Sequence, residues 1–164
     1  PELAYGFVAG VIAREMYEEF RGSMSAVGIP GERIRPRSFA TFGDYNRALR
    51  QSELAIMGYG WSLSYPDAQY VFQLFYGPNA APGANAANYR NAEFDRLYNE
   101  SATMEESPER TEIYRRMNQV VIDDCVAIMG LSRARVNLWH KRVRGLPDRE
   151  VLGGFWLRFV DVKD

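Results

Sequence analysis

Hydrophobic positions at the start of the chain recur with the spacing of a helix. An apolar residue returns at every fourth position from Val8 to Met24, and charged residues occupy much of the opposite face. Because residues four apart lie on one side of a helix, this pattern predicts an amphipathic helix over residues 5–26. Gly28 is expected to end this helix, since glycine readily adopts the left-handed backbone conformation of a carboxy-terminal cap.

The next three segments alternate between strand and helix patterns. Residues 33–39 form a short strand candidate, and Pro36 within it indicates an edge strand, because proline has no N–H to donate to a neighbouring strand. Residues 42–51 have the pattern of a second helix. A continuous apolar run that ends in glycines follows over residues 54–60, which is typical of a buried parallel strand. Helices and strands that alternate at this spacing predict an α/β fold.

The second half of the chain has mainly helix and loop patterns. Asp67 stands at the start of a predicted short helix over residues 67–75, where its carboxylate would cap free N–H groups; direct ligand contact is the alternative role. A loop of small and polar residues covers positions 77–91 and is long enough to be functional or mobile. The remaining predicted elements are helices over residues 92–101 and 108–124, the second capped by Ser107, and strands over residues 126–131, 136–139 and 155–160.

Composition and charge narrow the classes of function. The chain has 164 residues, most simply one domain, and its formal net charge of −1 gives no reason to expect nucleic acid or an anionic membrane as a partner. Cys125 and His140 are the only cysteine and histidine, so we expect no metal site, no cofactor and no Ser-His-Asp or Cys-His catalysis. Cys125 lies in an apolar run and is expected to be buried. No apolar stretch approaches the roughly 20 residues that span a membrane.

Aromatic residues gather between Tyr59 and Tyr76. This window of 18 positions holds seven of them and one formally charged residue, Asp67. Large rings beside glycines, a proline and small hydroxyls are typical of ligand-recognition loops, because rings provide contact area and hydroxyls fix orientation. A core strand followed by an aromatic helix is the alternative interpretation. The position after an apolar strand favours a site, because ligands of open α/β sheets bind beyond the carboxyl ends of strands.

The order of these segments resembles a known family. The pair Gly60-Trp61 is followed by Tyr65-Pro66-Asp67, an aromatic helix, a small-residue loop ending in Asn-Tyr-Arg-Asn-Ala-Glu-Phe-Asp at residues 88–95, and a helix and hydrophobic strand over residues 109–129. In this order the sequence resembles the C-terminal lobe of the family 5 extracellular solute-binding proteins, the oligopeptide-, dipeptide- and nickel-binding proteins of ABC importers. The resemblance covers nearly the whole chain.

The resemblance implies a fold and a role. The fold would be one lobe of a type II periplasmic binding protein, with a mixed sheet flanked by helices. Residues 1–164 would form a single partial domain, and the N-terminal lobe of the same protein would be missing, in agreement with the abrupt start at Pro1. Such a protein is not an enzyme. It closes over a peptide or peptide-like solute and delivers it to ABC permease subunits, in the periplasm or outside a Gram-positive cell as a membrane-anchored protein.

The resemblance also implies where the ligand binds. The expected ligand-binding residues are Tyr59, Trp61, Ser62, Ser64 and Tyr65, with Trp61 packed against the ligand, whereas residues 70–76 are expected to belong to the core. The family usually has an aspartate three residues after the tryptophan, which holds the free amino group of a bound peptide, but Ser64 stands there. A carboxylate facing an ammonium contributes about 1.5–3 kcal/mol, more than a neutral hydroxyl does. Two ligand classes therefore stay open: a peptide with a free amino end, or a blocked, cyclic or sugar-like solute.

Two further classes of function remain as alternatives. A hydrolase would use Asp67, Glu93 or Asp95 as acid and base, although each of these also stands at a predicted helix start. A single-stranded nucleic-acid-binding module would stack bases on the aromatic window. No lysine or arginine occurs between Leu54 and Tyr89 to contact phosphates, so this alternative is the weaker one.

Overall fold

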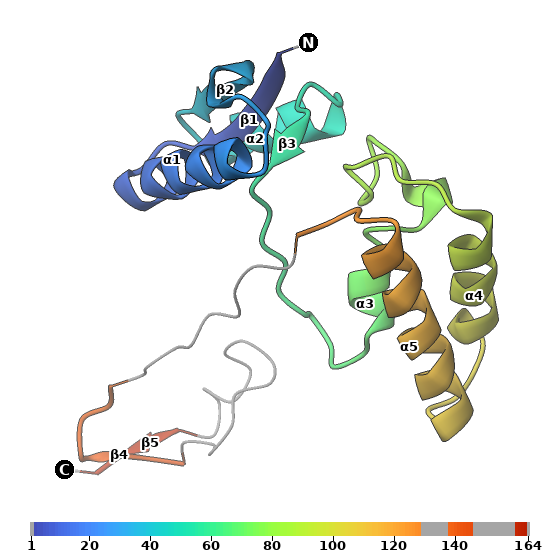
Figure 1. Ribbon diagram of the computed structural model, residues 1–164. Coiled ribbons are helices and arrows are strands. Elements are labelled where there is room, and N and C mark those ends of the chain that lie inside the picture. The colour runs from blue at the N-terminus through green and yellow to red at the C-terminus, as the bar shows by residue number, and fades with distance from the viewer. Residues whose placement is uncertain (1, 129–137, 146–159, 164) are drawn as a thin grey trace.

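The computed structural model describes residues 2–128, 138–145 and 160–163, and it has the α/β architecture that the sequence predicts. Figure 1 shows a small sheet with helices beside it in the amino-terminal part and a group of helices that follows, joined to the first part by an extended segment. Each of these two parts has its own cluster of buried hydrophobic side chains. Two further short strands, β4 (Val143–Arg144) and β5 (Asp161–Val162), pair antiparallel.

The amino-terminal sheet is parallel, with its first strand in the centre. β1 (Leu3–Val8) lies between β2 (Ile34–Phe39) and β3 (Ile56–Met57). All six residues of β1 pair with β2. The 3-10 turn η1 (Gly31–Arg33) directly precedes β2 in the chain. Within the described residues β2 is an edge strand, as its proline predicts. β3 runs parallel to β1, as predicted, but it covers only Ile56–Met57 instead of residues 54–60, and within the described residues it is a half-buried edge strand, not a buried one.

Strand β1 contradicts the helix predicted to begin at residue 5. Tyr5 and Phe7 are both buried and lie on one face of the strand, because side chains in a strand alternate between faces. Their rings pack against Tyr17 of the first helix, α1 (Val11–Ala26), with centroids 5.5 and 5.8 Å away. The helix therefore begins six residues later than predicted, and residues 5–8 belong to the sheet.

The buried face of α1 also differs from the predicted one. Tyr17 is buried, and Phe20 and Met24 pack beside it, whereas Ile12 and Met16 are exposed. The Tyr17 hydroxyl donates to the backbone carbonyl of Ile34 (2.9 Å), so its polar end has a partner inside the core. Of the apolar residues spaced four apart from Val8, those in the first half of α1 are therefore exposed, and only those toward the carboxy-terminal end of α1 pack against the core.

Helix ends in this part agree with their local signals. Gly28 follows α1 with φ of 86°, and its N–H donates to the carbonyl of Ser25 (3.1 Å). The second helix, α2 (Phe42–Arg50), begins after Thr41, whose hydroxyl oxygen accepts from the third helical N–H (3.1 Å). Both ends follow from side-chain and backbone preferences within a few residues.

The second part of the fold consists of helices around their own core. Its elements are α3 (Gln69–Phe72), the 3-10 turn η2 (Gly77–Asn79), α4 (Ala92–Ala102) and α5 (Pro108–Asp123). The last two confirm the predicted helices, and Ser107 caps α5 by accepting from the N–H of Arg110 (3.1 Å). The buried residues of this core, which come from α3, α4, α5 and the turn after α3, are Phe72, Phe75, Phe94, Leu97, Ile113, Met117 and Val121.

The predicted loop over residues 77–91 is organised around one buried polar residue. Asn85 is 0% exposed, and its side-chain amide donates to the carbonyls of Tyr76 (3.1 Å) and Tyr89 (2.8 Å). Its side-chain oxygen accepts from the N–H of Tyr89 (3.1 Å). These hydrogen bonds join the two ends of the loop, so the segment has a fixed shape although it contains little regular structure.

The carboxy-terminal part of the chain departs from prediction where it is described. Residues 126–128, 138–139 and 160 are not in strands; the rest of the three predicted strands lies outside the described residues. Cys125 is exposed, so the expectation that it is buried is wrong. It follows α5 with φ of 51°, a left-handed conformation that turns the chain away from the helix before the apolar residues resume.

Candidate functional site

The aromatic segment, defined here as residues 58–68, leaves the carboxyl end of β3 and leads into α3. It contains no helix or strand and includes all five residues predicted to bind a ligand. Figure 1 shows it as the extended stretch between the sheet and the helical part. The carboxyl end of a parallel strand is the place where α/β folds usually carry ligand sites, so the position agrees with the prediction.

The rings of this segment form an exposed, continuous array. Tyr59, Trp61 and Tyr65 are 41%, 39% and 44% exposed. Tyr59 stacks on Trp61 with ring centroids 5.8 Å apart and an interplanar angle of 28°. Tyr70, in the first turn of α3, lies 5.5 Å from Trp61 and meets Tyr65 edge-on at 4.9 Å. Four rings thus offer apolar faces and edges to solvent from neighbouring positions.

Tyr70 is the centre of this array, and sequence reasoning missed it by assigning residues 70–76 to the core. The Trp61 Nε1–H donates to the Tyr70 backbone carbonyl (2.9 Å), and the Ser64 hydroxyl donates to the Tyr70 hydroxyl (3.0 Å). Phe72 and Phe75 are buried as expected, whereas Tyr70 is only half-buried. Its hydroxyl was the available signal, since a polar-tipped ring suits a wet boundary better than a core.

The other predicted residues lie on the same exposed stretch. Ser62 and Ser64 are exposed, and the Ser64 hydroxyl is already engaged with Tyr70. Burial raises the pKa of the Tyr59 phenol, and the nearby positive charge of Arg50 acts in the opposite direction. The structure therefore joins Tyr59, Trp61, Ser64 and Tyr65 in one array with Tyr70, and Ser62 lies on the same exposed stretch.

Asp67 lies two residues before the first residue of α3 and accepts a hydrogen bond from the N–H of that residue, in agreement with its predicted structural role, and it also contacts α5. Its Oδ1 accepts from the N–H of Gln69 (2.8 Å) and from the Tyr114 hydroxyl (2.9 Å). Its Oδ2 forms an ion pair with Arg110 (2.7 Å). Burial alone would raise the pKa of this carboxyl, but the hydrogen bonds from Gln69, Tyr114 and Arg110 outweigh it and hold the pKa below its usual range.

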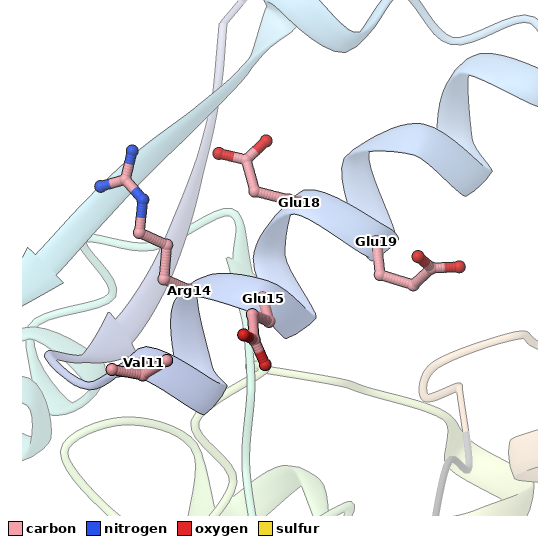
Figure 2. A pocket seen from close by; sticks show the side chains of 5 residues that line it. All are labelled: Val11, Arg14, Glu15, Glu18 and Glu19. Carbon is pink, nitrogen blue, oxygen red and sulfur yellow. The ribbon is translucent and has the colours of Figure 1, made fainter.

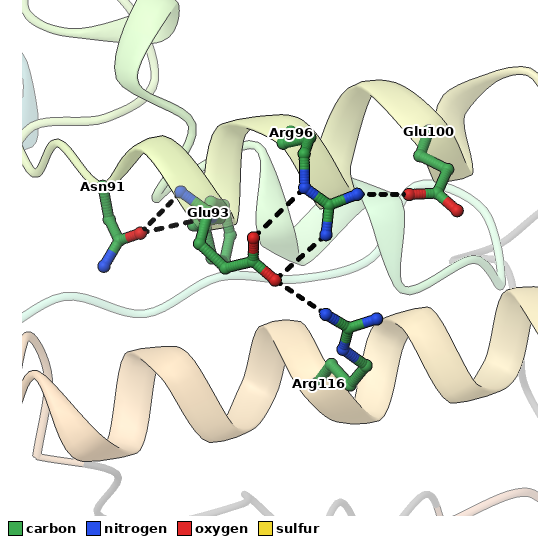
Figure 3. Close-up of polar contacts among 6 residues, drawn as sticks. Asn91, Glu93, Arg96, Glu100 and Arg116 are labelled. Atoms are coloured by element: carbon green, nitrogen blue, oxygen red, sulfur yellow. Dashed lines mark hydrogen bonds and ion pairs between the residues drawn. The ribbon is translucent and has the colours of Figure 1, made fainter.

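The carboxylates of the hydrolase alternative have structural partners. Figure 3 shows Glu93 of α4 contacting Arg96 on its own helix (3.0 Å) and Arg116 of α5 (2.7 Å). The hydrogen bond from Arg96 is the main cause that lowers the pKa of Glu93. Asp95 accepts from the backbone N–H of Gly77 (2.8 Å). These contacts, like those of Asp67, tie elements of the helical part together.

An open hollow of about 660 Å³ lies elsewhere, along α1 (Figure 2). It is lined by Val11, Arg14, Glu15, Glu18 and Glu19, which all come from that one helix. Exposed side chains of a single helix surround it, so it does not enclose a ligand in the described structure. The aromatic segment therefore remains the candidate site.

Among the described residues, no three or more His, Cys, Asp or Glu side chains gather in a way that could hold a metal ion. No helix in this part of the chain is long and apolar enough to cross a membrane.

No protein-family model matches the sequence. One curated relative is the heme-binding protein A of Haemophilus influenzae, which is 28% identical over 80 residues; the match covers 49% of this chain and 15% of that protein. The sequence likeness is therefore limited to half of the chain.

Solved structures match over more of its length. The oligopeptide-binding protein OppA of Haemophilus influenzae, in complex with the peptide RPPGFSPFR, superposes with a TM-score of 0.76 at 15% identity, covering 98% of this chain and 31% of that one. HbpA2 of Haemophilus parasuis has a TM-score of 0.73 at 17% identity, covering 99% and 32%. The periplasmic binding protein DppA of Helicobacter pylori, in complex with the peptide STSA, has a TM-score of 0.66 at 15% identity, covering 76% and 24%.

These neighbours define the fold as that of part of a periplasmic solute-binding protein. They are family 5 solute-binding proteins, and the resemblance seen in the sequence is thus confirmed at the level of fold. The chain spans between 15% and 32% of the lengths of the proteins compared above, so it corresponds to a fragment of such larger molecules. The neighbours are binding proteins rather than enzymes.

Proposed function

We propose that this chain is part of the substrate-binding component of an ABC importer, and that it forms the C-terminal lobe of a larger two-lobed protein. The fold it shares with peptide-binding proteins supports this proposal, and so does its coverage of less than a third of their length. The protein would work in the periplasm, or outside a Gram-positive cell as an anchored protein. Its partners would be the N-terminal lobe of the same protein and the permease subunits that receive the solute.

The observation that carries the proposal is the exposed ring array at the carboxyl end of β3. Trp61 and Tyr59 are stacked on each other yet each remains about 40% exposed. Exposed rings with a fixed geometry are costly to leave in water and favourable to cover, so they suit a surface that a solute and a second lobe would enclose. We assign Tyr59, Trp61, Ser62, Ser64 and Tyr65 to solute binding, with Tyr70 beneath them.

The proposed solute is a peptide or a peptide-like molecule. A second candidate is a solute without a free ammonium group, such as a blocked peptide, a sugar or heme, the last of which appears in the name of the curated relative. Two contacts favour this second candidate. Ser64 offers a hydroxyl that is shared with Tyr70, and both oxygens of Asp67 are occupied by Gln69, Tyr114 and Arg110. Within the aromatic segment no other carboxylate occurs to face an ammonium.

Calorimetric titration of the full-length protein tests both parts of the proposal. The probes are the tetrapeptide Ala-Phe-Ala-Ala, its N-acetylated form, hemin and maltotriose. We expect the two peptides to bind within about threefold of each other, because a neutral hydroxyl gives little preference for a free amine. A preference of more than about tenfold for the free amine would contradict the interpretation of Ser64. Binding of hemin or maltotriose alone would select the second candidate, and binding of none of the probes would count against the proposed function.

A further inference from the structure

Asp67 joins the aromatic segment to the helical core from the last turn before α3. Three donors converge on its carboxylate: the N–H of Gln69, the hydroxyl of Tyr114 and the guanidinium of Arg110, at 2.8, 2.9 and 2.7 Å. The first belongs to α3, and the other two belong to α5, more than 40 residues further along the chain. The ion pair is partly shielded from water, with side-chain exposures of 24% for Asp67 and 12% for Arg110.

The contacts of Asp67 with Arg110 and Tyr114 are called the joint below. On the side of α5, the two partner residues are themselves held in place. The Arg110 Nε–H donates to the backbone carbonyl of Ser101 at the end of α4 (3.0 Å), and its guanidinium lies 5.0 Å from the centroid of the Tyr114 ring. The same ring packs against Phe72 of α3, with centroids 5.5 Å apart. Arg110 and Tyr114 therefore approach Asp67 from a surface whose geometry α3, α4 and α5 fix together.

The near side of the joint is the ring array. Asp67 follows Tyr65 by two residues and precedes Tyr70 by three, and the N–H of Tyr70 donates to the Asp67 carbonyl (3.1 Å). Tyr70 in turn accepts the Trp61 indole N–H on its backbone carbonyl (2.9 Å). A displacement of Asp67 would thus also move Tyr70 and Trp61, because these hydrogen bonds link the three residues in series.

We infer that Asp67 is a positioning residue: its ion pair with Arg110 and its hydrogen bond from Tyr114 hold the aromatic segment in the geometry that binds solute. This inference rests on the proposed function, since it assigns to the same site a determinant outside the solute contacts. Asp67 does not touch the solute in this account. Both oxygens of its carboxylate accept from protein donors, and it acts through the place it gives to Tyr70 and Trp61.

The test compares two variants of the joint with a matched control in the full-length protein. Asp67→Asn removes the charge that faces Arg110, and Arg110→Met removes the cation from α5 without changing the aromatic segment. Glu93→Gln is the control, because Glu93 also joins α4 to α5 through an ion pair (2.7 Å to Arg116) but does not contact the segment. Binding of Ala-Phe-Ala-Ala and N-acetyl-Ala-Phe-Ala-Ala is measured by calorimetry, and the position of Trp61 by ¹⁹F NMR of protein labelled with 5-fluorotryptophan, its resonance assigned with Trp61→Phe.

We expect both joint variants to weaken binding of the peptides at least tenfold and to shift or broaden the Trp61 resonance. The control should bind within twofold of the unmodified protein and leave that resonance unchanged. Binding within twofold for Asp67→Asn, or an Arg110→Met variant that behaves as the control, would overturn the inference and leave Asp67 as a local helix cap. If the unmodified protein binds neither peptide, the proposed peptide function fails, and the Trp61 resonance alone then decides whether the joint positions the segment.

Discussion

Removal of the Asn85 side chain should destabilise the helical part. Its side chain is 0% exposed and makes three hydrogen bonds to backbone groups, two to carbonyls of Tyr76 and Tyr89 and one from the Tyr89 N–H. Asn85→Ala deletes all three and leaves these part-buried backbone groups without the Asn85 side chain as a partner. At about 1 kcal/mol for each hydrogen bond, the free energy of unfolding should fall by about 3 kcal/mol.

Urea denaturation followed by far-ultraviolet circular dichroism measures this loss. Asn118→Ala is the matched control, because Asn118 is exposed on α5 and its replacement should change the free energy of unfolding by no more than about 0.5 kcal/mol. A loss below about 1 kcal/mol for Asn85→Ala would refute the argument, since it would mean that these hydrogen bonds do not hold the loop over residues 77–91 together.

Three further predictions follow from individual contacts. The Asp67 carboxyl has a lowered pKa in the folded protein, so its stabilising effect is present above its ordinary pKa and is lost as the pH falls through the folded value. The difference in unfolding free energy between the unmodified protein and Asp67→Asn should therefore shrink from about pH 6 to about pH 3. A difference that stays constant over this range would contradict the prediction. Gly83→Ala should lower stability in urea by about 1–3 kcal/mol, because the new methyl group would overlap the backbone carbonyl of Asn79, and an unchanged midpoint would count against that contact. Cys125 is exposed and should react with a maleimide in the native protein nearly as fast as in urea, whereas strong protection would show that it is buried after all.

Elements with strong local signals could be predicted from the sequence. The end of α1 at Gly28, the start of α5 at Ser107 and the edge position of β2 all follow from preferences of single residues. Each depends on interactions within about four residues, such as a cap or the missing N–H of a proline. These features therefore depend little on the tertiary structure around them.

Elements that depend on distant partners could not be predicted. β1 needs β2, more than 25 residues away, to complete its hydrogen bonds, and a helix pattern that starts at Val8 concealed the alternation of Tyr5 and Phe7. Cys125 is exposed at the left-handed turn after α5. The sequence did not indicate this turn, because no glycine stands beside Cys125. For β1, pairing with a distant strand overrides the local pattern.

The candidate site also has a part that could be predicted from local sequence and a part that depends on distant contacts. Composition was sufficient to single out the aromatic segment, because rings, glycines and hydroxyls in one short stretch are informative on their own. The roles of Tyr70 and Arg110 were not visible, because one depends on the turn that brings α3 beneath Trp61 and the other lies 43 residues from Asp67. Sequence reasoning thus located the segment but not what holds it.

The most direct test of the account is solute binding by the full-length protein with and without the Trp61 ring. Calorimetry with Ala-Phe-Ala-Ala and its N-acetylated form compares the unmodified protein, Trp61→Ala and Phe42→Ala, the last removing an exposed ring from α2, outside the aromatic segment. We expect Trp61→Ala to weaken binding at least tenfold, about 1.4 kcal/mol, and Phe42→Ala to bind as the unmodified protein does. Equal binding by all three proteins would contradict the claim that the aromatic segment is one wall of the solute site.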